Sequence, residues 1–252
     1  MNPDHVGDHF DRVAPDYDMW KQKAHRYYDA LKASLRDIVP PGSMVLEVGC
    51  ATGDILASLA PDVGVGLDIS PEMIERASGK HPELRFMVHD LMHGPLDERF
   101  DFVVAADVAE HVPDLDTMMR SLAAMLSERG VAVVVTANPL WSPVLHLAEW
   151  LKLKMPEGDH EWRSREDLAT SARRAGMRER SFDRSMIVPR DVPGLRALDS
   201  AAWAAGVRRR TGLIQRAIFE SAVTARSRSS PGKPPHPRVA HPPPELPRSL
   251  VA

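Results

Sequence analysis

This 252-residue sequence has almost no cysteine and no long apolar run. The single cysteine, Cys50, excludes an intramolecular disulfide and is typical of a protein from a reducing compartment. No apolar stretch approaches the roughly 20 residues that a helix needs to cross a bilayer, so we expect no membrane span. The first residues, MNPDHVGDHFDRVAPDYD, are acidic and interrupted by proline and glycine, which does not fit a secretory signal. We therefore expect a soluble, cytoplasmic protein.

An excess of one charge is also missing. Lys and Arg number 32 and Asp and Glu 35, so the formal net charge of −3 gives no general attraction to nucleic acid or anionic membranes. The basic residues of 208–210 and 226–238 have no interleaved aromatics, which favours a solvated surface over a nucleic-acid site. The histidines and acids show no compact ligand spacing, so no metal is expected. Nothing in the sequence indicates an oligomeric state.

What the sequence does have is an alternation of short apolar runs with helical patterns. Runs rich in β-branched residues at 44–48, 63–68, 84–88, 100–106 and 130–136 predict strands, and the helical patterns between them predict βαβ units and a parallel sheet. Ser70 and Pro71 signal one helix start, and Ser164 caps another that ends near Gly176. Apolar residues from Leu115 to Leu126 recur at helical spacing. Segments 178–183 and 186–189 are weaker candidates for late strands.

The chain divides into three parts on this pattern. Residues 1–39 are expected to form a helical cap, and residues 40–224 the main domain, with a lid insertion at 138–163. The helical part of that insertion is apolar except for a narrow stripe of Ser142, His146 and Glu149, so core, partner, lipid or ligand must cover it. Residues 225–252 are rich in Pro, Ser and Arg, and we expect a disordered tail there.

Acids stand at the ends of three successive predicted strands, namely Glu47, Asp68 and Asp90. In a parallel sheet the carboxyl ends of the strands border the ligand crevice, and the small residues after Glu47 let backbone approach a ligand. A dinucleotide fingerprint needs G-x-G-x-x-G, whereas this turn has an alanine and an aspartate at its second and third glycine positions. A ligand with an ammonium group, a sulfonium and a ribose suits the acids better. S-adenosylmethionine is such a ligand.

The order of these motifs resembles the class I S-adenosylmethionine-dependent methyltransferases. LEVGCATGD is similar to their first motif, and GLDISPEMIERA, HDLMHGPL, FDFVVAADVAEHVPDL and LSERGVAVVVTAN follow in family order over residues 40–140. The resemblance implies an α/β, Rossmann-like, doubly wound sheet of seven strands in the order 3-2-1-4-5-7-6, with strand 7 antiparallel. It also implies S-adenosylmethionine as cofactor. One departure is Ala51, which stands at the middle glycine of the first motif.

Site residues follow by position in the motifs. Glu47 is expected to orient the cofactor's amino group, directly or through water, and Asp68 to hold the ribose. The remaining cofactor contacts that the resemblance implies are Tyr17 from an N-terminal closing element, Gly49, Ala51 and Gly53 along the methionine, Ile69, Asp90 and Leu91 at the adenine, and Ala106 and Asp107 beneath the methionyl end.

Plainer interpretations exist for several of these residues. Glu47 is alternatively a strand-end acid facing water, Asp68 a turn residue, Asp90 a cap of the next turn, and Tyr17 a packing aromatic. Cys50 is expected to pack as a small apolar group.

A base for the reaction has one leading candidate. His111 follows the fourth strand and suits proton removal from a hydroxyl or amine. His146 and His160 are rivals, and a structural pairing of His111 with Glu110 or Asp114 is the plainer alternative.

The sequence thus predicts a methyltransferase that moves the cofactor's methyl group to oxygen, nitrogen or carbon of a small, partly apolar acceptor by direct displacement. The apolar insertion around 141–153 is where acceptor specificity is expected. Two alternatives remain open at this point: an NAD(P)-dependent oxidoreductase, and a non-catalytic scaffold that binds S-adenosylmethionine.

Overall fold

The computed structural model describes residues 3–156, 158, 161–185 and 211–222. Its centre is one seven-stranded sheet of order β3-β2-β1-β4-β5-β7-β6, as the resemblance implies. The strands are β1 (Met44–Val48), β2 (Val63–Asp68), β3 (Arg85–Val88), β4 (Phe100–Ala106), β5 (Leu126–Ala137), β6 (Met177–Ser185) and β7 (Ile214–Ser221). The first five strands pair in parallel, and β7 runs antiparallel to both β5 and β6.

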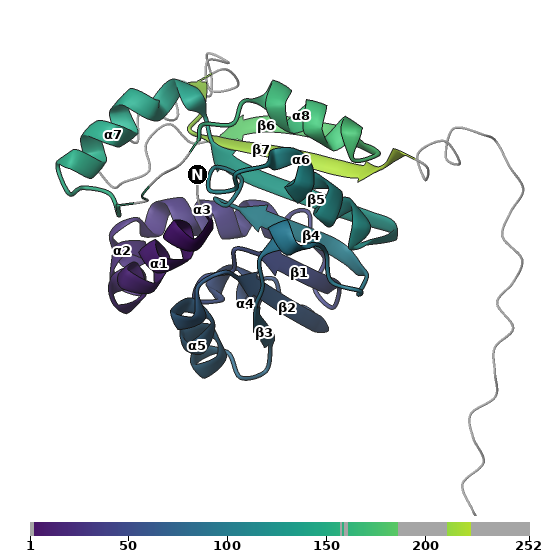
Figure 1. Cartoon of the computed structure of the whole chain (residues 1–252), viewed down its shortest axis with the longest axis horizontal. Helices are drawn as coiled ribbons and strands as arrows, with labels where there is room; N and C mark the ends of the chain where they lie inside the picture. Colours follow the sequence, from purple (N-terminus) through teal and green to yellow (C-terminus); the bar gives the residue numbers. More distant parts are fainter. Residues whose placement is uncertain (1–2, 157, 159–160, 186–210, 223–252) are drawn as a thin grey trace, which may run out of the picture.

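Helices cover both faces of this sheet (Figure 1). They are α1 (Pro3–Val13), α2 (Tyr17–Lys23), α3 (His25–Arg36), α4 (Asp54–Ser58), α5 (Pro71–Lys80), α6 (Leu115–Ala124), α7 (Ser142–Trp150) and α8 (Arg165–Arg174). One buried cluster joins the sheet to α6 and α8 through Met118 and Leu168. A second joins the opposite face to α3 and α4 through Leu31 and Leu56. Because Val45 and Leu46 point to opposite clusters, β1 is buried on both faces, as a central parallel strand must be.

Local helix signals act where the sequence places them. The Ser70 hydroxyl accepts a hydrogen bond from the Met73 N–H at 3.1 Å and starts α5 at Pro71. Ser164 starts α8 with a capping box. Its hydroxyl accepts a hydrogen bond from the Asp167 N–H, and the Asp167 carboxylate accepts one from the Ser164 N–H. Both caps join residues within three positions of the helix start, so they are local signals.

One predicted boundary is wrong. Apolar spacing extends the helix from Leu115 through Leu126, but α6 ends at Ala124 and Leu126 already pairs with Phe100 in the sheet. Leu126 is buried in the same cluster as α6, so its apolar side chain fits either element and spacing alone cannot separate them.

The late strands are only partly anticipated. β6 contains the predicted segment 178–183. No segment predicted from the sequence corresponds to β7 at Ile214–Ser221. The other predicted late strand, 186–189, lies outside the described residues, as do the rival histidine His160 and the predicted tail at 225–252. The predicted division between a helical cap at 1–39 and the main domain at 40–224 stays a prediction. Helix α3, which belongs to the predicted cap, packs into a core that it shares with the sheet.

Candidate functional site

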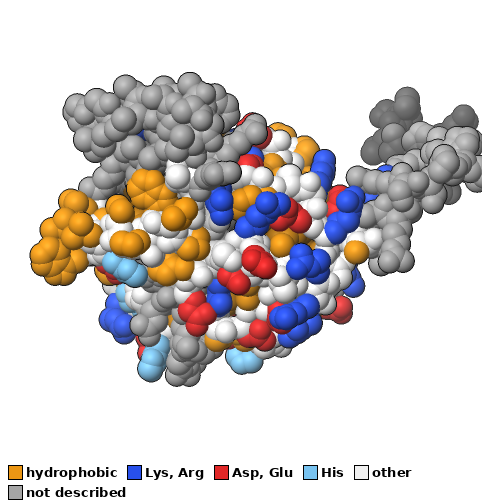
Figure 2. Space-filling view, turned by 90° about the horizontal axis from the view of Figure 1, so that it is seen from above, with side chains coloured by type: hydrophobic (Ala, Val, Ile, Leu, Met, Phe, Trp, Pro, Cys, Tyr) orange, Lys and Arg blue, Asp and Glu red, His pale blue; other side chains and the backbone are white. Residues whose placement is uncertain are grey.

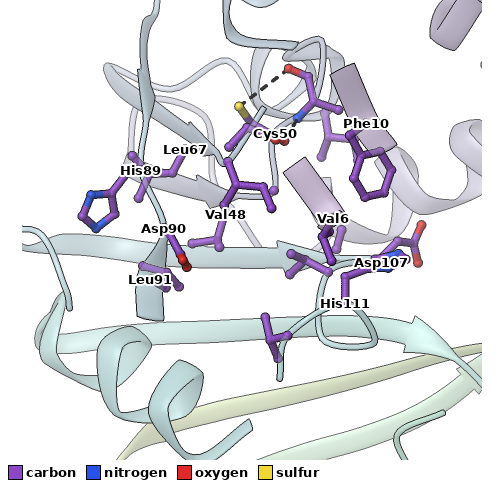
Figure 3. Close-up of a pocket in the computed structure, with 18 of the residues that line it drawn as sticks. Val6, Phe10, Val48, Cys50, Leu67, His89, Asp90, Leu91, Asp107 and His111 are labelled. Carbon is purple, nitrogen blue, oxygen red and sulfur yellow. Dashed lines mark hydrogen bonds between the residues drawn. The ribbon is translucent and has the colours of Figure 1, made fainter. Parts of the chain in front are cut away.

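A pocket lies at the carboxyl ends of β1, β2 and β4 and is closed from above by α1 and α2; we call it the first pocket. Figure 3 shows Asp90 and Leu91 on one side of it and Phe10, Asp107 and His111 on the other. The residues that line it and were predicted from sequence are Tyr17, Gly49, Ala51, Asp68, Ile69, Asp90, Leu91, Ala106, Asp107 and His111. Only Glu47 and Gly53, of the predicted site residues, do not line it. The topology thus gathers side chains from positions 17 to 111 around one space.

The turn after β1 adopts left-handed backbone at alternate residues. Gly49, Ala51 and Gly53 have φ values of 68°, 45° and 79°. A Cβ at Gly49 would lie 2.8 Å from the Val108 side chain, so this position needs glycine for space as well as for conformation. Ala51 holds the same left-handed region with a side chain, at a cost that glycine avoids. The departure from the family motif is therefore accommodated as local backbone strain.

Asp68 fixes the turn after β1, as the plainer interpretation predicts, and its ribose contact stays a prediction. One carboxylate oxygen accepts the Ala51 N–H at 2.9 Å, and the other accepts the Ser70 N–H at 3.0 Å. Burial raises the pKa of Asp68, while these hydrogen bonds oppose the shift. The carboxylate therefore fixes the glycine turn against the end of β2 and still borders the first pocket.

Asp90 likewise caps a local turn and borders the first pocket. Its side chain accepts the Met92 N–H at 2.8 Å and begins the short 3-10 helix at Leu91–His93. The residue also lines the first pocket together with Leu91. The capping interpretation is confirmed, and the adenine contact stays a prediction.

Glu47 lies behind the turn. It is 1% exposed, and one of its oxygens accepts the Leu56 N–H at 2.9 Å, which ties β1 to α4. Its other oxygen is buried and has no hydrogen-bond partner among the described residues. Burial raises the pKa of Glu47 to about 8, although the nearby Lys21 charge opposes this. The alternative of a strand-end acid facing water is wrong for Glu47.

Lys21 is a pocket residue that sequence reasoning missed. This α2 side chain is 9% exposed and lines the first pocket. Its Nζ lies 4.7 Å and 5.2 Å from the ring centroids of Tyr17 and Tyr28, and 3.9 Å from a carboxylate oxygen of Asp54. Burial lowers the pKa of Lys21. No local signal marks it, because a lysine in a short helix is ordinarily solvated and only the packing of α2 over the turn buries this one.

His111 also faces the first pocket. Its ring meets the edge of Phe10 with centroids 5.3 Å apart, and the residue is 8% exposed. The rival His146 is exposed on α7, packs against Trp162 at 5.7 Å and lines neither pocket described here. His111 is therefore the better placed of the two histidines.

Cys50 behaves as expected. It is buried beside the turn, and burial raises the pKa of its thiol well above the usual value. It lines the first pocket as an inert, apolar group.

A second pocket adjoins the first beneath α7. It lies between α2, α3, the end of β5 and α7, and it shares only Tyr28 and Asp107 with the first pocket. Asp107 has a positive φ of 55°, and its two carboxylate oxygens accept the Tyr27 hydroxyl at 2.6 Å and 2.7 Å. The apolar side chains from α7 and its flanks that line this pocket are Trp141, Val144, Leu145, Ala148, Leu153 and Met155. It is thus an apolar space with a polar end at Asp107, Tyr27 and Glu110.

Two absences concern the described residues only. They hold no cluster of three or more histidine, cysteine, aspartate or glutamate side chains placed to bind a metal. Among them, no helix combines the length and the apolar character that crossing a membrane requires.

Comparisons with known proteins agree on one family. A family model described as a methyltransferase domain matches residues 19–179. The chain is 30% identical over 167 residues to the demethylmenaquinone methyltransferase of Lactobacillus johnsonii, covering 56% of this chain and 64% of the relative. It is 31% identical over 130 residues to a ubiquinone biosynthesis O-methyltransferase of Bradyrhizobium diazoefficiens, covering 48% and 51%. The chain thus spans less than two thirds of the length of these relatives.

Solved structures share the fold at low sequence identity. Magnesium protoporphyrin IX methyltransferase from Synechocystis, solved with bound S-adenosylhomocysteine, has a TM-score of 0.61 at 19% identity, covering 87% of this chain and 99% of that one. An S-adenosylmethionine-dependent methyltransferase from Thermotoga maritima has a TM-score of 0.65 at 18% identity, covering 86% and 100%.

Proposed function

The chain belongs to the class I S-adenosylmethionine-dependent methyltransferases, and from this premise we propose that it methylates a small, partly apolar acceptor held in the second pocket. S-adenosylmethionine is its cofactor, which sets aside the nicotinamide alternative. The observation that carries the proposal is the pair of adjoining pockets whose shared wall is Tyr28 and Asp107. A methyl group at that junction would be within reach of an acceptor on the other side.

The first pocket suits the chemistry of the cofactor. Asp68 and Asp90 border it at the ends of β2 and β3, where carboxylates suit the ribose hydroxyls and the adenine amino group, and Ile69 and Leu91 offer apolar contact to the base. Gly49 and Ala51 bring backbone close to the methionine part. At the other end Lys21 supplies a buried ammonium, to which we assign the cofactor's carboxylate. Glu47 acts from behind the turn, through the backbone that it anchors or through water.

The chemistry of transfer needs little from the protein beyond placement. The bound cofactor supplies a methyl group on a sulfonium that leaves readily, so no covalent enzyme intermediate is required. The apolar wall of α7 excludes water, and the pocket junction aligns the acceptor with the methyl group. Where the acceptor carries a proton, we assign its removal to a ring nitrogen of His111, which lines the first pocket, so the acceptor's nucleophilic group must extend through the junction into that pocket. Asp107, held by the Tyr27 hydroxyl, orients the acceptor's polar group.

The nature of the acceptor follows from the lining of the second pocket. Its walls are mostly apolar and its polar groups gather at one end, which fits a molecule with a polar, nucleophilic head and an apolar body. Relatives of the chain support this class, since their names refer to demethylmenaquinone and to 2-methyl-6-phytyl-1,4-hydroquinone.

Binding and turnover together test the proposal. Calorimetry should show S-adenosylhomocysteine binding and no comparable NADH binding. A panel of hydroquinones, phenols and amines with apolar substituents should then yield a methylated product by mass spectrometry. Tight S-adenosylhomocysteine binding with no product from any acceptor would favour the scaffold alternative, and the absence of binding would contradict the assignment of the first pocket.

A further inference from the structure

The outward face of α7 is apolar, although it is turned away from the core. Leu140, Val144, Leu147 and Leu151 recur at spacings of four, three and four residues, so they form one stripe along the helix and its flanks. We call this stripe, together with Trp150 and Leu153, the α7 face. The exposed fractions of its side chains are 68% for Leu140, 52% for Val144, 54% for Leu147, 78% for Trp150, 49% for Leu151 and 46% for Leu153. Figure 2 shows hydrophobic side chains gathered over the place that α7 occupies in Figure 1.

The acceptor pocket does not account for this face. Three α7 side chains line the second pocket, namely Val144, Leu145 and Ala148, and only Val144 of these belongs to the α7 face. The polar stripe of Ser142, His146 and Glu149 occupies only the remaining side. A helix that covered a pocket and otherwise met water would carry polar residues where the α7 face carries leucine and tryptophan.

The face is continuous with the mouth of the second pocket. Val144 and Leu153 belong to both, being about half exposed and also part of the pocket lining. Across the pocket, α2 contributes Trp20, and the exposed Met19 stands beside it in sequence. A molecule or surface that contacts the α7 face therefore also contacts the mouth of the second pocket, where we place the acceptor.

Cationic side chains flank this mouth on both sides. The exposed Lys152 lies between Leu151 and Leu153 of the face, and Lys154 is part of the pocket lining. On the α2 side, the Nζ of the exposed Lys23 lies 4.3 Å from the ring centroid of Trp20. An apolar surface with a tryptophan at its border and lysines around it matches the interface of an anionic bilayer, where leucines enter the acyl region and lysines meet the headgroups. This local arrangement acts despite the chain's net charge of −3.

We propose that the α7 face and the lysines beside it dock the protein on an anionic lipid surface. Docking is peripheral, since α7 has nine residues and no described helix is long and apolar enough to span a membrane. Docking places the mouth of the second pocket at the bilayer. An amphiphilic acceptor would then enter the pocket from the bilayer with its polar head first and its apolar body behind. This consequence for the acceptor rests on the proposed function, whereas the docking itself does not.

Vesicle flotation of the full chain, without cofactor or acceptor, tests the docking. The protein should float with vesicles of equal parts phosphatidylcholine and phosphatidylglycerol, and more weakly with phosphatidylcholine alone. L147S/W150S should lower the partition coefficient at least about tenfold on both, because burial of these side chains drives insertion. K23E/K152E should lower it at least about tenfold on the anionic vesicles only. Val63→Ser is the matched control, an exposed apolar position at the opposite end of the strands that should change nothing.

Three outcomes would overturn the inference. One is wild-type protein that floats with neither vesicle. Another is flotation that L147S/W150S leaves intact, and a third is a lower melting temperature or an altered oligomeric state in that variant, which would show that protein covers the face. S-adenosylhomocysteine calorimetry on the same samples separates this failure from failure of the proposed function, because the first pocket does not involve α7.

Discussion

Single side chains in this protein serve the fold and border the pocket at once. Asp68 and Asp90 each accept backbone N–H groups that set a turn, and each lines the first pocket. Both uses are possible because a carboxylate has about four acceptor positions, so two hydrogen bonds from the backbone leave others for a ligand. The same bonds hold the side chain in place before the ligand arrives, which reduces the ordering cost of binding.

Replacing Asp68 by alanine should weaken S-adenosylhomocysteine binding by about 1–3 kcal/mol, the range for losing hydrogen bonds to a charged group. Calorimetry measures this directly. Asp62→Ala is the matched control, because Asp62 is exposed just before the other end of β2. An unchanged affinity in Asp68→Ala would show that the ribose assignment is wrong, provided that circular dichroism confirms a folded variant.

Glu47 should make stability fall as pH rises. Its folded pKa is about 8 against an ordinary value of 4.5, so between these values the folded state binds more protons than the unfolded state. The free energy of unfolding therefore decreases as the pH rises from about 4.5 to about 8, because the stabilising contribution of protonated Glu47 is lost. Glu47→Gln, which cannot ionise, should flatten that slope in urea unfolding.

The exposed Glu72 provides the control for this slope, since Glu72→Gln should leave the pH profile unchanged. A wild-type slope that persists in Glu47→Gln would assign it to another group. Lys21, whose pKa burial lowers, acts in the opposite direction.

Among the elements, α7 carries apolar side chains on two sides. Its inward stripe closes the second pocket, and its outward stripe is exposed. A cofactor-binding sheet does not require such a helix, and the proposed function assigns its inward stripe to the acceptor. Substitutions on the two stripes should accordingly have different effects.

Ala148→Trp should fill the second pocket and lower kcat/KM for the acceptor by more than about tenfold, because one indole displaces the acceptor's apolar body. S-adenosylhomocysteine affinity should stay within about twofold, since Ala148 does not line the first pocket. Leu147→Trp, one position away on the outward face, is the matched control. Equal loss of kcat/KM in both variants would contradict the assignment of the second pocket.

At the scale of the whole molecule, the antiparallel end of the sheet is held by a buried amide. Gln215 on β7 is fully buried, and its side chain donates to the carbonyls of Ala137 and Arg163 and accepts from Arg184. It thus joins β5, β6, β7 and the segment that leads into α8.

Gln215→Ala should destabilise the protein by about 2–4 kcal/mol, because it leaves buried carbonyls without donors and opens a cavity. Urea unfolding measures the change. Gln22→Ala, at an exposed position of α2, should cost less than about 0.5 kcal/mol. A similar small cost at Gln215 would show that the amide is not a structural junction.

Local sequence signals predicted the parallel strands through their apolar runs and two helix starts through the Ser70 and Ser164 caps. The strand order was implied only by the family order of the motifs, and the structure confirms it. Carboxyl ends of parallel strands meet at one edge whatever the detailed packing, so Asp68, Asp90 and Asp107 were bound to gather there.

The arrangement of Glu47, Lys21 and the two pockets depends on tertiary packing. Glu47 turns under α4 and Lys21 is buried by helix packing, because both depend on contacts between segments distant in sequence. Spacing also could not end α6 before Leu126, since a buried leucine suits a helix and a strand equally. The junction at Tyr28 and Asp107 exists only because α3 and the end of β4 meet, which no local pattern encodes.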